Sequence, residues 1–396
     1  MKNERRICSR CVMDTTDPLI VFDEEGICNY CRLHDHLEKL HPLNEEGKER
    51  LEAIIAKIKD RGRGKPYDCV IGISGGTDST YQLYLANKFG LRPLVVHFDN
   101  GWNSNIAVSN IEKATRRLGY DLHTYVVDWE EFKNLQVAFL KASTPDSEIP
   151  TDIAIKSTLY RVAAKEGIKT IIKGHSFRTE GRTPLLWSYG DGRYIKDVNR
   201  TFNKKRLRSF PNLTLIKLFY YTLVKRIKQI RLLYYVEYDK DMIKTMLKNE
   251  FDWKDYGGHH YESIYTRFCQ GYILPFKFNI DKRKREFSAL IRSRQMTRAE
   301  ALEKIKQPPL SSEREKRDRA YVIKKLDLTE GDFSHIMSAP QKTFLEYKTY
   351  YPWISRLRKM VRIFYKLISP TTPLLLYSPG IRRIRQLIKD GKIFNG

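Results

Sequence analysis

The sequence predicts an α/β fold, a doubly wound parallel sheet with a four-cysteine module before it and a basic helical region after it. Three observations lead to this prediction. Two Cys-x2-Cys pairs lie within the first 31 residues. Short β-branched runs alternate with helical stretches between residues 68 and about 200, and such alternation is typical of parallel sheets. Beyond residue 200 the sequence becomes helical, tyrosine-rich and basic.

The N-terminal cysteines have the spacing of a structural zinc site. Cys8 and Cys11 are followed, after 16 residues, by Cys28 and Cys31. Each pair supplies two thiolates from one tight turn, and four thiolates complete a tetrahedron. We therefore expect Zn²⁺ with a structural role, because four protein ligands leave no open position. A redox dithiol pair and disulfides are the alternatives.

The central part of the chain shows the alternation directly. Residues 45–61 have helical spacing, and RGRGKP at 61–66 ends that helix. We expect buried strands at 68–73, 92–99, 121–128 and 169–174, separated by helices near 78–89, 105–118 and 151–166. Ligands of such sheets bind at the carboxyl ends of the strands. The stretches SGGTDS, HFDNGWNS and GHSFRTE follow three of these strands, so they should meet in one cleft.

The stretch SGGTDS at 74–79 has the composition of an anion-binding loop. It lacks the lysine of the Walker motif. Gly75 and Gly76 would let backbone N–H groups approach a phosphate closely, and the N-terminus of the next helix would face the anion. Asp78 beside an anion indicates an intervening Mg²⁺. A plain strand-to-helix turn would explain the glycines but not this aspartate.

Charge separates the two halves of the chain. Residues 1–200 carry 30 Lys and Arg against 28 Asp and Glu, whereas residues 201–396 carry 42 against 19. The basic half indicates an anionic partner or a solvated lysine-rich surface. No secretory signal is visible at the N-terminus and the most apolar stretch, 213–236, is interrupted by five basic residues, so we expect a cytoplasmic protein.

Longer motifs resemble a known family. SGGTDS after an apolar strand resembles the loop of the N-type ATP pyrophosphatases, the PP-loop superfamily. Within it, the chain resembles the N-acetyl sugar amidotransferases of bacterial surface-polysaccharide and nonulosonic-acid pathways, from Cys8 to about Pro309. The motifs are CSRCVMDTTDPLIVFDEEGICNYC (8–31), DNGWNSNIAVSNIEK (99–113), VVDWEEF (126–132), EIPTD (148–152), GGHHYES…TRF (257–268), DKRKREFSALI (281–291) and MTRAEAL (296–302).

This resemblance implies an adenine nucleotide alpha-hydrolase-like fold and a reaction that uses ATP and Mg²⁺ and forms AMP and pyrophosphate. An acetamido group of a nucleotide-activated sugar would become an acetamidino group through an adenylylated imidate. Catalytic roles are expected for Asp78, Lys173 and Glu180. ATP and magnesium are expected at Ser74, Gly75, Gly76, Thr77, Asp78, Ser79, His97, Asp99, Asn100 and Gly174. Substrate contacts are expected at Trp102, Asn103, Asp152, His175, His259, His260, Arg267 and Arg283.

One motif departs from the family pattern. The family usually has G-x-N-x-x-T-E after the fourth strand, and this chain has GHSFRTE. The role of the family's asparagine in orienting substrate therefore has no counterpart here. His175, which follows the first glycine of this motif, is expected either as a substrate contact or as a satisfied surface histidine. Lys282 and Lys284 flank Arg283, and such a run is also typical of a solvated face.

Ammonia is expected from elsewhere. The chain begins Met-Lys, and neither Cys69 nor Cys269 lies in a glycine-flanked elbow. The resemblance therefore implies a separate glutaminase with an ammonia-channel subunit similar to those of histidine biosynthesis. A basic amphipathic stretch at 352–369 is expected to dock that partner, to rest on the inner membrane, or to pack on the protein itself.

We expect four segments and two rival functions. The segments are a zinc module (1–44), a PP-loop domain (45–200), a basic helical substrate or partner region (201–340) and a basic amphipathic extension (341–396). A tRNA thiolation enzyme would share the loop and use the basic half as an RNA surface, although nucleic acid is disfavoured by the shortage of further cysteines. A non-catalytic nucleotide-binding zinc module is the other alternative.

Overall fold

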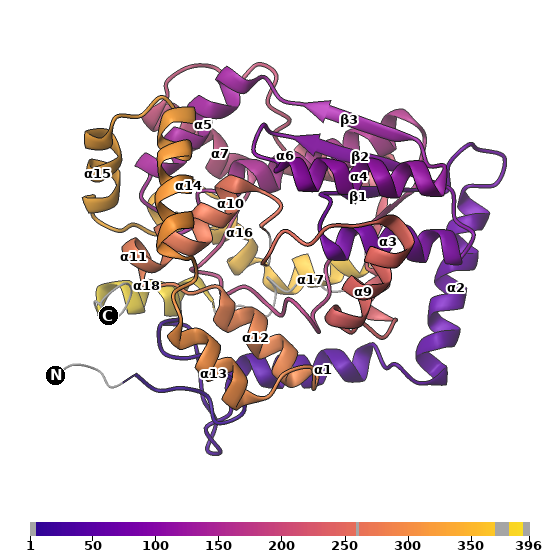
Figure 1. The fold of residues 1–396 in the computed structure, drawn as a ribbon, viewed down its shortest axis with the longest axis horizontal. Coiled ribbons are helices and arrows are strands. Elements are labelled where there is room, and N and C mark those ends of the chain that lie inside the picture. Colours follow the sequence, from indigo (N-terminus) through magenta and orange to yellow (C-terminus); the bar gives the residue numbers. More distant parts are fainter. Residues whose placement is uncertain (1–4, 259–260, 369–379, 391–396) are drawn as a thin grey trace.

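The computed structural model describes residues 5–258, 261–368 and 380–390 (Figure 1). Within them, a five-stranded parallel sheet has the order β3–β2–β1–β4–β5. Its strands are β1 (Cys69–Ile73), β2 (Pro93–Asp99), β3 (Leu122–Val126), β4 (Thr170–Ile172) and β5 (Lys228–Ile230). The predicted doubly wound sheet is confirmed. The chain order reverses between β1 and β4, which is where such sheets bind ligands.

Helices cover both faces of the sheet. Alternate strand residues point to opposite faces: Ile71 and Val95 pack in one apolar cluster, and Val70 and Val96 in another. The first cluster lies under α3 (Thr77–Lys88) and α4 (Asn105–Leu118), and the second under α6 (Ile149–Lys165). Both faces are therefore dry, as the uninterrupted apolar runs predict.

Two strands differ from expectation. β3 forms the edge of the sheet and is largely exposed, so the expectation of a buried strand at 121–128 was wrong. β5 lies in the region expected to be helical, and pairs with β4 through Thr170 opposite Lys228. Its three residues are too few to show an apolar alternation in the sequence. They form a strand because they pair with β4.

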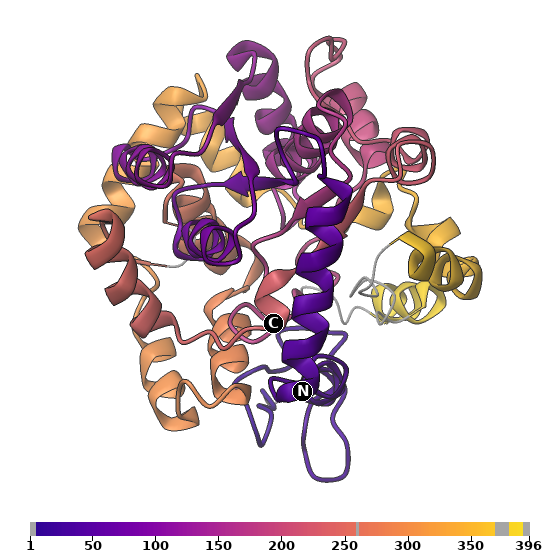
Figure 2. The ribbon, with the colours of Figure 1, turned by 90° about the vertical axis from the view of Figure 1, so that its right-hand side faces the viewer.

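The remaining helices surround the sheet and the carboxyl ends of its strands (Figures 1 and 2). Before β4 they are α1 (Asn29–Leu40), α2 (Glu45–Arg61) and α5 (Trp129–Lys141). After β4 they are α7 (Gly192–Phe202), α8 (Leu215–Phe219), η1 (Tyr220–Val224), η2 (Leu232–Tyr234), α9 (Lys240–Phe251), α10 (Ile264–Phe268), η3 (Cys269–Ile273), α11 (Leu274–Phe278), α12 (Arg283–Arg292), α13 (Arg298–Lys306), α14 (Ser312–Lys325), α15 (Glu330–Ser338), η4 (Phe344–Glu346), α16 (Tyr351–Arg356), α17 (Arg358–Ile368) and α18 (Ile381–Lys389).

The N-terminal module meets the C-terminal half of the chain below the sheet, where α1, α12 and α13 lie together in Figure 1. The backbone N–H of Val12 donates to Ser288 Oγ at 3.2 Å. Lys284 Nζ lies 2.9 Å from the buried Asp14 carboxylate. The N-terminal module is therefore held by α12, which also borders the cavity described next.

Candidate functional site

A cavity of about 890 Å³ lies at the carboxyl ends of β1, β2 and β4. The loop after β1, the segment after β4 and one side of α6 form its sheet side. Residues from 240 to 309 close it from the opposite side. All three polar stretches expected to share a cleft contribute to this lining, in agreement with the sheet topology.

The glycine loop joins β1 to α3, with both glycines at tight approaches. Gly75 has φ +77°, and a Cβ there would lie 2.3 Å from the Ala107 carbonyl oxygen. A Cβ on Gly76 would lie 3.1 Å from both Tyr256 Oη and Glu262 Oε1. Ser79 Oγ donates to the Gly76 carbonyl at 3.1 Å and folds the loop over the helix start. The N-terminus of α3 therefore faces the cavity, the arrangement that favours a bound anion.

Three side chains from the C-terminal half contact this loop, and none of them was among the predicted site residues. The Thr77 backbone N–H donates to Tyr256 Oη at 3.2 Å, and Ser74 Oγ donates to Glu262 Oε1 at 3.2 Å. The Tyr238 hydroxyl donates to Asp78 Oδ1. Burial and the adjacent Asp78 carboxylate raise the pKa of Tyr238 well above its ordinary value, so it is a neutral donor. Glu262 belongs to the GGHHYES motif, which was the available signal.

Acidic groups and one lysine gather beside the loop. Lys240 Nζ lies 2.7 Å from Glu286 Oε1, and both side chains are largely buried. Burial alone would lower the pKa of Lys240, but the carboxylates of Glu286, Asp78 and Glu180 outweigh it and raise that pKa. Lys240 is therefore an ammonium among oxygen donors. Asp78 and Glu180 both line the cavity, and hard oxygen ligands of this kind suit Mg²⁺.

The segment after β4 brings a second lysine to the cavity. Burial, and then the cations of Lys156 and Arg231, lower the pKa of Lys173 well below its ordinary value. A bound phosphate would reverse much of that shift, because an opposite charge favours the ammonium form. Gly174 continues the lining.

His175 is a neutral lining residue with both ring nitrogens in use. Burial lowers its pKa to about 3. Its Nε2 lies 3.2 Å from the Gly181 carbonyl, which can only accept, so Nε2 carries the proton. The Tyr234 hydroxyl donates to Nδ1 at 3.4 Å. The orientation of His175 in the cavity lining is thus set by the protein itself.

The end of β2 adds polar groups of fixed orientation. His97 Nδ1 lies 3.1 Å from the Ile73 carbonyl, so Nε2 accepts from Asn103 Nδ2 at 3.2 Å. Asn100 Nδ2 donates to Thr151 Oγ1 at 3.1 Å. His97, Asn100 and Asn103 line the cavity with Asp152, as do Ser74, Gly76, Thr77 and Ser79 of the loop.

Four predicted contacts lie elsewhere. Trp102 is fully buried, and its indole N–H donates to Gln136 Oε1 at 2.7 Å, so it packs in the core. Arg267 makes two hydrogen bonds to Asp318, at 2.6 and 2.7 Å, which join α10 to α14. Gly75 packs against α4, and Asp99 accepts from the Gly101 N–H at 2.8 Å at the strand end. None of the four is among the lining residues. The roles expected for Trp102, Arg267, Gly75 and Asp99 in contacting ATP or substrate therefore stay predictions.

A group of basic residues also lines the cavity, and we call this part of the lining the basic end. Arg283, paired with Asp281 at 2.7 Å, lines it together with Lys282, Arg285 and Lys304. Lys282 lies 3.7 Å from Glu148, and burial raises the pKa of that carboxyl. Lys284 instead pairs with Asp14 and lies outside the lining. His259 and His260 lie outside the described residues.

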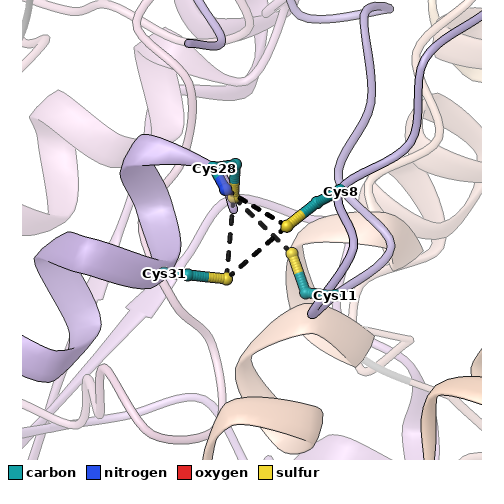
Figure 3. A group of neighbouring side chains, drawn as sticks. All are labelled: Cys8, Cys11, Cys28 and Cys31. Carbon is teal, nitrogen blue, oxygen red and sulfur yellow. Dashed lines mark hydrogen bonds between the residues drawn. The ribbon is translucent and has the colours of Figure 1, made fainter. Parts of the chain in front are cut away.

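The four N-terminal cysteines form a separate centre (Figure 3). Their sulfur atoms all lie within 4.8 Å of one another, with separations of 3.7 Å for Cys11 to Cys28 and 3.9 Å for Cys8 to Cys31. A zinc tetrathiolate with bonds of about 2.3 Å has tetrahedron edges of about 3.8 Å. The cluster therefore fits Zn²⁺, whereas an iron–sulfur cube between the thiolates would hold them farther apart.

Arginines from the C-terminal half support this centre. The buried Arg292 donates from Nε to Cys31 Sγ at 3.2 Å and from Nη2 to Cys11 Sγ at 3.3 Å. Arg298 donates from Nη2 to the Cys8 carbonyl at 3.1 Å. An arginine beside four thiolates offsets the negative charge of a tetrathiolate zinc site. No cysteine of the described chain lines the large cavity, and Cys69 and Cys269 are buried as well.

Comparisons with known proteins come from sequence and from structure. An uncharacterized protein of Methanocaldococcus jannaschii is 31% identical over 170 residues, which are 42% of this chain and 58% of that protein. A U34-tRNA thiolase of Methanococcus maripaludis, solved with its 4Fe–4S cluster, is 13% identical with a TM-score of 0.31, over 85% of this chain and 90% of its own. The NMN synthetase of Francisella tularensis is 14% identical with a TM-score of 0.26, over 46% and 95%. At such TM-scores neither structure bears on the chemistry here.

A family model gives the informative match. Residues 262–360 match the model described as LPS biosynthesis protein WbpG-like, C-terminal domain. The match begins at the Glu262 that contacts the glycine loop and includes α12, which contributes Arg283, Arg285 and Glu286 to the cavity. It agrees with the family resemblance expected from the motifs. Residues 262–360 of this chain are therefore similar to the WbpG-like C-terminal domain.

Proposed function

We propose that this protein is an ATP-dependent amidotransferase that converts an acetamido group of a nucleotide-activated sugar into an acetamidino group. One observation carries this proposal: a single cavity joins a glycine loop, carboxylates and a basic end, in a chain with a WbpG-like domain. Because that family is described by LPS biosynthesis, the proposed pathway is that of O-antigen or a related surface glycan.

The proposed reaction has two steps. The amide oxygen attacks the α-phosphorus of ATP, the bond from that phosphorus to the β-phosphate oxygen breaks, and pyrophosphate leaves. Ammonia then adds to the imidate carbon, and AMP departs with the original amide oxygen. An amide oxygen is a poor leaving group, whereas AMP is a good one. The ATP is therefore used to convert the amide oxygen into part of AMP.

Named residues suit each part of this scheme. The loop from Ser74 to Ser79 would bind the pyrophosphate through backbone N–H groups and the α3 N-terminus. Mg²⁺ at Asp78 and Glu180 would neutralise the charge of the leaving group. Lys173 and Lys240 would add positive charge on either side. The basic end, with Arg283 and Arg285, would hold the diphosphate or monophosphate of the sugar nucleotide.

We further propose that ammonia comes from a separate glutaminase with an ammonia-channel subunit. Glutaminase chemistry needs an accessible nucleophile, commonly a thiolate. Burial raises the pKa of Cys269 and that of Cys69 above their ordinary value. The zinc-site thiolates are engaged with one another and with Arg292. Free ammonium should therefore replace the partner in a purified system.

The test uses isotopes. The full-length protein is incubated with ATP, Mg²⁺, ammonium and a UDP- or CMP-linked acetamido sugar whose carbonyl carries oxygen-18. We expect AMP that contains the heavy oxygen and a sugar product about one mass unit lighter than the unlabelled substrate. Phosphate or ADP in place of AMP would contradict the proposed first step.

The same assay separates the rival functions. AMP that appears only with tRNA and a sulfur donor would make the protein a tRNA thiolation enzyme. ATP binding without turnover of any acceptor would leave a non-catalytic nucleotide-binding module. The described lining of the cavity has no cysteine to carry sulfur, which favours the sugar substrate over the tRNA base.

A further inference from the structure

The excess positive charge of the chain is concentrated in two stretches without acidic residues. Residues 198–236 contain ten Lys and Arg and no Asp or Glu. Residues 347–389 also contain ten Lys and Arg and no Asp or Glu. Together they account for twenty of the net charge of +25. Neither stretch is needed for the cavity, because none of its residues is among the lining.

The first stretch contains a helical segment, α8 with η1, that has one buried face. Tyr221 is buried and stacks on Tyr160 of α6, with ring centroids 5.3 Å apart. The opposite face is apolar and exposed: Ile216 is 81% exposed and Val224 is 68% exposed. Phe219, Tyr220 and Leu223 are exposed as well. Lys217 and Arg226 are exposed beside them.

The second stretch repeats this pattern. Tyr351 at the start of α16 is buried and packs against Tyr189 and Phe344. The helix surface beyond it is exposed and apolar, with Met360 and Ile363 each 66% exposed. Trp353 and Leu357 are also exposed. The exposed basic residues there are Arg356, Lys359 and Arg362.

Both segments lie on one side of the molecule. The C-terminal helices, drawn in yellow, stand at the right-hand edge of Figure 2, and the pink segment that follows α7 lies above them on that edge. In Figure 1 both segments lie on the side of the molecule that faces away from the viewer. There α17 lies behind the sheet, whereas α9 and α10, which border the cavity, lie in front. We call these exposed apolar and basic residues of α8–η1 and α16–α17 the basic apolar face.

We propose that the basic apolar face binds the surface of an anionic lipid bilayer. Exposed apolar side chains flanked by Lys and Arg, with no acidic residue, are typical of helices that lie in the membrane interface. Each basic residue near an anionic surface adds to the attraction. A nucleic acid would match the charge but would leave large aliphatic side chains such as Ile216 and Ile363 without a partner. No helix of the described residues is long and apolar enough to cross a bilayer, so the contact is peripheral.

This inference is independent of the proposed reaction and is tested with lipid alone. Full-length protein is sedimented with vesicles of phosphatidylethanolamine and phosphatidylglycerol, and with neutral phosphatidylcholine vesicles. We expect binding to the anionic vesicles only, weakened by salt. The affinity of the double variant Ile216→Asp/Ile363→Asp for anionic vesicles should fall by about tenfold or more. Two inserted side chains are lost and two negative charges are added.

A matched control and three contrary outcomes complete the test. Val108 of α4 is 49% exposed, and α4 covers the face of the sheet opposite α6, on which η1 packs, so Val108→Asp should leave vesicle binding unchanged. Equal loss in Val108→Asp and the double variant would overturn the assignment of the face. Absence of binding to anionic vesicles at low salt would overturn it too. Vesicle-independent dimerisation that the double variant abolishes, without vesicle binding, would assign the face to a second copy.

Discussion

Lys240 is the residue whose position most directly suggests a part in the chemistry. It lies among carboxylates next to the loop and is not a motif residue. We expect Lys240→Met to lower the rate of AMP formation about 100-fold, the usual effect of removing one electrostatic contact to a transition state. Lys240→Arg should retain more activity. Lys113→Met, which removes an exposed pair with Asp252 outside the cavity, should have no effect.

A purely structural role for Lys240 predicts a different pattern. Removing one partner of a buried ion pair destabilises because the other charge is left behind. The double variant Lys240→Met/Glu286→Gln removes both charges, so it should recover thermal stability. If it also recovered the rate, Lys240 would act only through Glu286.

His41 should make the protein sensitive to acid. Burial lowers the pKa of His41 to about 4, and it lies among Tyr234, Tyr235 and Phe177. The unfolded chain therefore binds more protons between pH 6.5 and 4, and stability falls as the pH falls through that window. From pH 7.5 to 5 this residue should cost about 2 kcal/mol of unfolding free energy. Urea denaturation at both pH values should show a smaller loss in His41→Phe. An equal loss in both proteins would contradict the assignment.

At the scale of elements, the sequence predicted helix ends that depend on capping residues and glycines close by in the chain. The helix expected at 105–118 is α4, because Ser104 accepts from the Ala107 N–H at its start and Gly119 has φ +66° at its end. The helix α5 was not predicted, although Asp128 in the VVDWEEF motif caps it. β5 and the contacts of Glu262 with the loop depend on residues far apart in sequence, and no spacing predicts them. The four segment boundaries stay predictions.

The loop between β1 and α3 gives an element-scale prediction with a built-in control. Gly75 and Gly119 both have positive φ, but only Gly75 has an atom within reach of an added Cβ, the Ala107 carbonyl at 2.3 Å. We expect Gly119→Ala to cost about 1 kcal/mol of unfolding free energy from the backbone alone. Gly75→Ala should cost about 3 kcal/mol or more, because α4 must also move away from α3. Equal costs in chemical denaturation would show that the loop and α4 do not pack this closely.

At the scale of the molecule, the four-cysteine centre and the cavity are both supported by one helix. α12 contributes Arg283, Arg285 and Glu286 to the cavity at its start and Arg292 to the cysteines at its end. The apolar cluster around Cys8 and Cys31 also contains Tyr265 and Phe333 of the C-terminal half. The motifs predicted the metal ligands and most of the loop residues separately. They could not predict that one helix connects the two sites.

Because α12 connects the two sites, we expect removal of the metal to loosen the part of the cavity that α12 forms. Arg292→Ala removes the hydrogen bonds from the guanidinium to Cys31, Cys11 and Cys28. We therefore expect a 10- to 100-fold loss of zinc affinity by chelator competition, the usual effect of removing a side chain that hydrogen-bonds to metal ligands. Arg32→Ala, which removes exposed ion pairs with Asp23 and Glu25 only, is the control. Stripping the metal from the unaltered protein should raise hydrogen exchange in residues 283–292 and raise KM for the sugar nucleotide, while β1 and β2 stay protected. Faster exchange confined to residues 5–31 would mean that the cysteine centre stabilises only itself, and that α12 is held in place by its other contacts.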